Sequence, residues 1–134
     1  MREFLFRGKR TYSNTWVEGS LVSTAQGNAY IISTVEDRRH ATVLVNQCSI
    51  NVEPETVGQF TGLTDKNGVK IFEGDIVTGY FNHEKIVGYI FYGGNAQFFI
   101  QRDGIYGIGL DNSDCWLEVI GNIHDNPELI EGGG

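Results

Sequence analysis

Short apolar stretches alternate with glycine- and asparagine-containing turns along most of the chain. Apolar residues do not recur at helical intervals over any long segment, and 18 glycines interrupt the sequence, so little helix is predicted. Stretches rich in β-branched and aromatic residues are typical of strands. We expect strands at 4–7, 16–22, 28–35, 42–46, 49–52, 62–63, 69–72, 75–81, 85–92, 96–102, 105–110 and 116–123.

The segment Glu53-Pro54-Glu55 is the best internal boundary, because proline cannot donate a ladder hydrogen bond and the flanking charges favour solvent. After it, short strands follow one another at intervals of about ten residues, as in a small antiparallel barrel or sandwich. We therefore predict a mainly β fold. An N-terminal β-rich segment occupies 1–55, a β-barrel 56–126, and a short turn with a disordered tail 127–134.

The stretch 58–77 contains two glycine turns. Asn67 and Gly68 both tolerate positive φ, which predicts a type I′ turn. At the second turn Gly74 permits a sharp reversal, and the Asp75 carboxylate can accept backbone N–H bonds. A calcium loop is excluded, because Val69 stands where such a loop needs Asp or Asn. We assign a structural role, fixing strand register, to Gly58, Gly62, Asn67, Gly68, Gly74 and Asp75.

Three segments together resemble the signature of the YopX family. They are VGQFTGL at 57–63, DKNG at 65–68 and IFEGDIV at 71–77. The tail EVIGNIHDNPEL at 118–129 and the start REFLFR at 2–7 are similar to that family's ends. The resemblance implies a mostly β phage or prophage protein with an SH3-like barrel and an uncharacterised function. It supplies no catalytic residues, and 11–50 match no pattern.

Charge is distributed unevenly along the chain, whose net charge is −7. Residues 1–49 carry a net charge of +2, and residues 50–134 carry −9. An acidic body repels phosphate backbones, so we expect no nucleic-acid partner. Two alternatives remain open: nucleic-acid binding through the basic N-terminal strip, and mimicry of DNA by the acidic part. The strip consists of Arg2, Arg7, Lys9 and Arg10.

Cysteine use and hydropathy indicate the compartment. Cys48 and Cys115 form no CxxC pair, which argues against a zinc site and a disulfide framework. The N-terminus lacks the apolar core of a signal peptide, and the longest nearly apolar run, 86–92, is too short to cross a bilayer. We expect a cytoplasmic protein of the host cell with reduced thiols and no membrane contact.

No catalytic constellation is evident. His40, His83 and His124 show no metal-ligand spacing. An acidic neighbour, Asp114, disfavours the reactive thiolate of Cys115. The acidic pairs flank turns, where carboxylates are commonly solvated or capping; the pairs are Glu53 with Glu55 and Glu73 with Asp75. We expect no enzyme activity, no cofactor and no metal; a small enzyme using His83, His124 or Cys115 is the least favoured alternative.

The strand at 85–92 is apolar on both faces. Alternation places Val87, Tyr89 and Phe91 on one face and Ile86, Gly88, Ile90 and Tyr92 on the other. A barrel buries one face, so the other can pack against the N-terminal part or a second subunit. Tyr89, Phe91 and Tyr92 are therefore candidate interaction residues. The leading hypothesis is a non-enzymatic module that binds a host or phage protein, with homo-oligomerisation left open.

Overall fold

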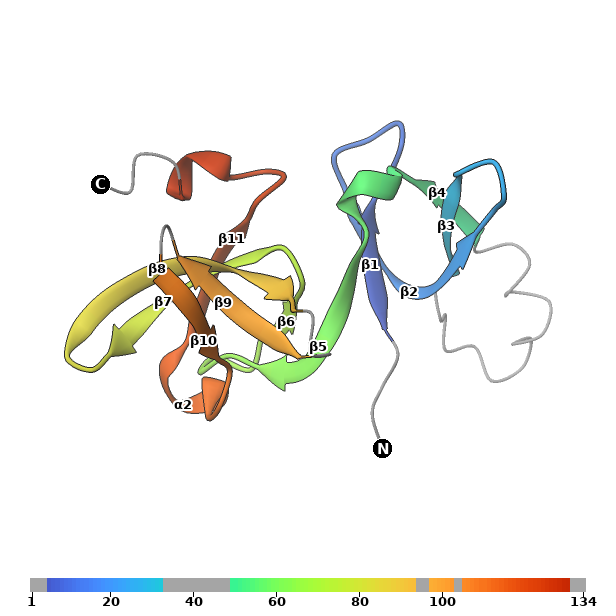
Figure 1. Cartoon of the computed structure of the whole chain (residues 1–134). Coiled ribbons are helices and arrows are strands. Elements are labelled where there is room, and N and C mark those ends of the chain that lie inside the picture. Colours follow the sequence, from blue (N-terminus) through green and yellow to red (C-terminus); the bar gives the residue numbers. More distant parts are fainter. Residues whose placement is uncertain (1–4, 33–48, 94–96, 103–104, 131–134) are drawn as a thin grey trace. The chain divides into compact units, whose positions relative to one another are not determined.

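The computed structural model describes residues 5–32, 49–93, 97–102 and 105–130. The mainly β class predicted from the sequence is confirmed: the described elements are strands, apart from one short α-helix and two 3-10 turns. The chain divides into two compact units, Met1–Phe60 and Thr61–Gly134 (Figure 1). The strand expected at 42–46, residues 103–104 between two expected strands, and the tail 131–134 lie outside the described residues.

The N-terminal unit is an antiparallel sheet with strand order β4-β3-β2-β1-β5. Its small core consists of Ala29, Ile31 and Val52. The unit's last strand, β5, continues past Phe60 into the second unit. The elements are β1 (Phe6–Lys9), β2 (Trp16–Ser23), β3 (Ala29–Ile32), β4 (Ser49–Val52), the 3-10 turn η1 (Pro54–Thr56) and β5 (Gly58–Thr64).

The C-terminal unit contains a five-stranded antiparallel sheet of order β10-β9-β8-β7-β11, and β6 pairs with β5. Its elements are β6 (Lys70–Phe72), β7 (Asp75–Phe81), β8 (Glu84–Tyr92), β9 (Phe98–Arg102), β10 (Ile105–Gly109), α2 (Ser113–Trp116), β11 (Glu118–Asn122) and the 3-10 turn η2 (Pro127–Leu129). One face of the sheet forms the larger core, of Ile71, Val77, Ile86, Ile90, Phe98, Ile100, Leu110 and Leu117. Of the two faces predicted for β8, the one with Ile86 and Ile90 is therefore the face that lies in the core.

A closed barrel, expected from the strand spacing, is not formed by the described strands. The five-stranded sheet ends at β10 and β11, and the neighbours of β5 are β1 and β6. Both edge strands are irregular: the register shifts between Ile105 and Ile108 in β10 and between Val119 and Gly121 in β11. Spacing predicted the strands and their hairpins, but it cannot specify which edge pairs with which.

The last strand begins later in the structure than the prediction of 116–123. Trp116 ends α2, and β11 begins at Glu118. The buried Ser113 hydroxyl donates to the Thr64 carbonyl at 2.9 Å, and the Leu117 N–H donates to the Ser113 carbonyl at 3.0 Å. These bonds hold one helical turn over 113–116, so that the strand begins at Glu118 and not at Trp116 as predicted.

The type I′ turn expected at Asn67-Gly68 is not formed. Gly68 has φ of +80°, but Asn67 is not among the residues with positive φ. The Asp65 carboxylate accepts the Asn67 N–H at 2.8 Å and the Val69 N–H at 2.9 Å, and the Gly68 N–H donates to the Asp65 carbonyl at 3.0 Å. Asp65 thus selects a wider turn in which Gly68 alone needs the left-handed conformation.

A two-residue turn of that kind occurs instead between β7 and β8. Phe81 pairs with Glu84, and the residues between them, Asn82 and His83, have φ of 51° and 67°. Both central residues of a type I′ turn require positive φ, and Asn-Gly is its favoured sequence. His83 therefore occupies a position that favours glycine.

We expect His83→Gly to raise the free energy of unfolding by about 0.5 kcal/mol, because relief of left-handed strain exceeds the added chain entropy. Asn82→Gly is the matched control and should gain less, since Asn tolerates this conformation. Urea unfolding measures both. A destabilised His83→Gly variant would show that the imidazole has a structural role the turn geometry does not explain.

Candidate binding cleft of the C-terminal unit

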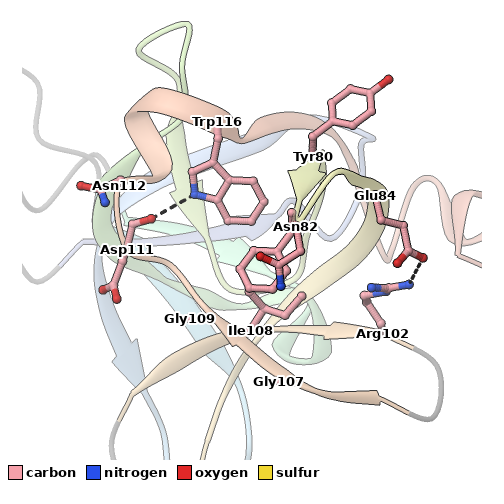
Figure 2. Close-up of a pocket in the computed structure, with 11 residues that line it drawn as sticks. Tyr80, Asn82, Glu84, Arg102, Gly107, Ile108, Gly109, Asp111, Asn112 and Trp116 are labelled. Atoms are coloured by element: carbon pink, nitrogen blue, oxygen red, sulfur yellow. Dashed lines mark hydrogen bonds and ion pairs between the residues drawn. The ribbon is translucent and has the colours of Figure 1, made fainter.

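A cleft of about 870 Å³ opens in the C-terminal unit. Its walls come from the β7–β8 hairpin, the end of β9, β10 and the segment that leads into α2. Figure 2 shows Trp116 and Tyr80 on one side of the opening and the end of β10 on the other. Asp111 stands at one end, and the ion pair of Glu84 with Arg102 at the other.

Aromatic side chains dominate one wall of the cleft. The Phe81 and Trp116 rings lie 5.8 Å apart, and Tyr80 is 70% exposed. The Trp116 indole N–H donates to the Asp111 carbonyl at 3.0 Å, which fixes the ring's orientation. Gly79 makes room for it, because a Cβ there would lie 2.8 Å from the Trp116 ring carbon Cε3. The wall is therefore preformed.

The rim of the cleft is polar. Arg102 and Glu84 form an ion pair with a nitrogen–oxygen distance of 3.4 Å. Asn82 and Asn112 also line the cleft, and they are two of the three non-glycine residues with positive φ in the described chain. Asparagine adopts this conformation more readily than most residues, so both positions fit ordinary turn geometry at the rim.

The six turn residues lie along β5 to β7. Gly62 and Gly74 have φ of 89° and 92°, and Gly68 also has positive φ. The Asp75 carboxylate accepts the Phe72 N–H at 2.7 Å, the kind of contact expected at this turn. Gly58 begins β5 and pairs with Arg7 of β1. None of the six lines the cleft.

Asp65 connects the turn to β11, a role that the sequence pattern alone did not indicate. Its residue surface is 2% exposed, and its carboxylate also accepts the Val119 N–H at 2.9 Å. Burial alone raises the pKa of Asp65, but the N–H bonds from Val119, Val69 and Asn67, with the charge of Lys66, lower that pKa below its ordinary value. The position of Asp65 three residues before Gly68 is the sequence signal that could have indicated it.

The aromatic residues proposed from the sequence lie outside the cleft. Tyr89 and Phe91 are half-buried on the face of β8 opposite the core, with ring centroids 6.5 Å apart. Phe91 contacts Phe99 at 5.6 Å. Tyr92 is 47% exposed, and its ring meets Phe98 edge-on at 5.0 Å. The cleft residues Tyr80 and Trp116 were not singled out, because only the tertiary fold brings them together.

The other candidate residues are dispersed. His83 and Cys115 are exposed, His124 is half-buried, and His40 and Cys48 lie outside the described residues. In the described part of the chain no three His, Cys, Asp or Glu side chains are placed to hold a metal ion. Of the basic strip, Arg7 lies over the Trp16 ring, with its guanidinium carbon 4.9 Å from the centroid. No helix among the described residues has the length and apolar character to span a membrane.

Fold and cleft together define a mainly β protein of two antiparallel units, one of which carries an aromatic-lined cleft. The chain belongs to the YopX family: the family model described as YopX protein matches residues 5–131. A solved structure, protein EF1440 from Enterococcus faecalis, is similar, with a TM-score of 0.57, 26% identity, and coverage of 98% of this chain and 100% of that chain. No curated protein matches the chain.

Proposed function

We propose that this chain is a phage or prophage accessory protein that works by binding another protein rather than by catalysis. The observation that supports this most is the preformed cleft, in which Phe81 and Trp116 contact each other and Tyr80 is 70% exposed. Tyr and Trp at the centre of a patch are typical anchors of protein–protein interfaces. The cytoplasm of the host cell is the compartment in which we expect this binding.

We further propose an SH3-like arrangement for the C-terminal unit. Its strands β7, β8, β9 and β10 form an antiparallel meander, and one helical turn, α2, precedes β11. β11 then returns to pair with β7, the first strand of the meander. One fold can support many unrelated functions, so the functional proposal depends on the cleft and not on the fold.

The proposal is tested by capture from host lysate on the immobilised full chain, with and without nuclease and across a salt series. We expect a protein that stays bound to the immobilised chain after nuclease treatment and at moderate salt. When this protein is purified, it should form a defined complex with the chain. Retention that nuclease abolishes would overturn the proposal in favour of nucleic-acid binding through the basic strip. A captured DNA-processing enzyme that competes with DNA would favour mimicry by the acidic residues.

A further inference from the structure

We propose that the ligand of the cleft is a cationic side chain, arginine or lysine, on an extended segment of the partner protein. This inference rests on the proposed function and specifies its chemistry. Three observations support it: the aromatic wall, the charge of the lining and an equivalent contact elsewhere in the same chain.

The aromatic wall presents the surface that a cation prefers. Trp, and then Tyr and Phe, attract Lys and Arg through the negative face of the ring. The polar edge of Trp116 is already satisfied, because its indole N–H donates to the Asp111 carbonyl at 3.0 Å. What Trp116 offers a ligand is therefore its π surface. The Phe81 ring lies 5.8 Å from the Trp116 ring, and Tyr80 also lines the cleft.

The charges that line the cleft also favour a cation. Arg102 is paired with Glu84 at 3.4 Å, so these two charges offset each other. Asp111 supplies a further carboxylate, for which no cationic partner is seen among the described residues. The unit as a whole is acidic: residues 61–134 contain four Lys and Arg against eleven Asp and Glu.

This charge pattern discriminates between occupants. A wholly apolar segment would leave the net negative charge of the lining without a complementary group. An acidic segment or a phosphate backbone would be repelled by the surrounding carboxylates. A guanidinium or ammonium group would pack on the rings and offset the net negative charge of the lining residues Glu84, Arg102 and Asp111, so a basic segment is the occupant that the lining complements.

The N-terminal unit contains the same chemistry in an occupied form. There the Arg7 guanidinium carbon lies 4.9 Å from the centroid of the Trp16 ring. In the C-terminal unit, Trp116 lines an open cleft instead. The sequence contains two tryptophans. The Trp116 ring is open to a ligand, whereas the Trp16 ring is already covered by Arg7 and serves as the control in a binding experiment.

The test follows the two indole N–H resonances of the ¹⁵N-labelled full chain, assigned with Trp16→Phe. The probes are N-acetyl-argininamide, N-acetyl-lysinamide and the neutral isostere N-acetyl-citrullinamide. We expect a saturable shift of the Trp116 resonance with the two cationic probes, at least tenfold weaker binding of the citrulline probe, and no saturable shift of Trp16. Asp111→Asn should weaken arginine binding about threefold to tenfold at low salt, and the exposed neighbour Asp114→Asn should not.

Equal binding of arginine and citrulline, or no saturable shift of Trp116, would overturn the cation proposal. Different results would contradict the proposed protein-binding function and the proposed cation site. If lysate capture yields a partner that a cleft variant no longer binds, while the probes bind equally, the cleft binds protein but not through a cation. If the arginine probe binds as expected and capture is abolished by nuclease, the cation site stands and the protein-binding function falls.

Discussion

Asp65→Asn is expected to lower the free energy of unfolding by about 3 kcal/mol, because hydrogen bonds to a charged group are each worth about 1.5–3 kcal/mol and a buried donor left unpaired adds a penalty. The carboxylate accepts three backbone N–H groups, at 2.8, 2.9 and 2.9 Å, and the residue is 2% exposed. An amide has one oxygen, so its NH₂ group would face a backbone N–H, and at least one of the three hydrogen bonds would be lost.

The same carboxylate makes stability depend on pH. Its pKa is lowered in the folded state, so the unfolded chain binds the proton more readily. The contribution of Asp65 is therefore present above the unfolded pKa of about 3.9 and is lost as pH falls through that value toward the lower folded pKa. In the wild type, stability should fall below about pH 5, and Asp65→Asn should remove part of that slope.

Urea unfolding of both proteins between pH 3 and pH 7 measures the two effects. Asp114→Asn, which alters an exposed carboxylate on α2, is the matched control and should keep the stability of the wild type at pH 7. An Asp65→Asn variant as stable as the wild type at pH 7 would contradict the role assigned to these three bonds.

Gly74→Val is expected to cost about 3 kcal/mol, the sum of left-handed strain and of overpacking at a buried position. Gly74 is buried with φ of 92°. Its N–H donates to the Ile90 carbonyl at 2.9 Å, and its carbonyl accepts the Ile123 N–H at 2.9 Å. Any shift that relieves the valine side chain would disturb these bonds to both β8 and the end of β11.

Gly68→Val separates the two contributions to this cost. Gly68 has a similar φ of 80°, but a Cβ there would meet nothing within 4 Å, so the expected loss is about 1 kcal/mol from backbone strain alone. Melting temperatures and urea midpoints of the two variants give the comparison. Equal losses would show that packing at Gly74 is unimportant, and unchanged midpoints in both would refute the requirement for positive φ.

Local patterns predicted much of this fold, because strand residues and turn residues act over short distances. Alternation along 85–92 predicted two apolar faces, and the face with Ile86 and Ile90 is the one that contributes to the core. The failures arose where a side-chain hydrogen bond decides the backbone conformation, over two residues at Asp65 and over a long sequence separation at Ser113. Asp65 sets the turn at Asn67 through its carboxylate, and Ser113 holds a helical turn before β11 by bonding to Thr64.

The cleft could not be predicted in the same way. Tyr80 and Trp116 are separated by thirty-six positions in the sequence, and neither lies in a recognisable motif. They line one wall because β7 and α2 are adjacent in the folded unit, with Gly79 permitting the close approach of Trp116. The aromatic pattern of the sequence predicts an interaction surface on β8, where Tyr89 and Phe91 are half-buried and Tyr92 is 47% exposed, and this stays a prediction.

The central claim, that the aromatic cleft binds a partner protein, is tested most directly by comparing two tyrosine variants in nuclease-treated capture. Tyr80→Ser changes a cleft residue that is 70% exposed, and Tyr12→Ser changes a residue of the N-terminal unit that is 94% exposed. Neither should alter stability appreciably. We predict that Tyr80→Ser reduces recovery of the wild-type partner at least tenfold, by loss of an aromatic anchor, while Tyr12→Ser retains it. Equal recovery by both variants would contradict the claim.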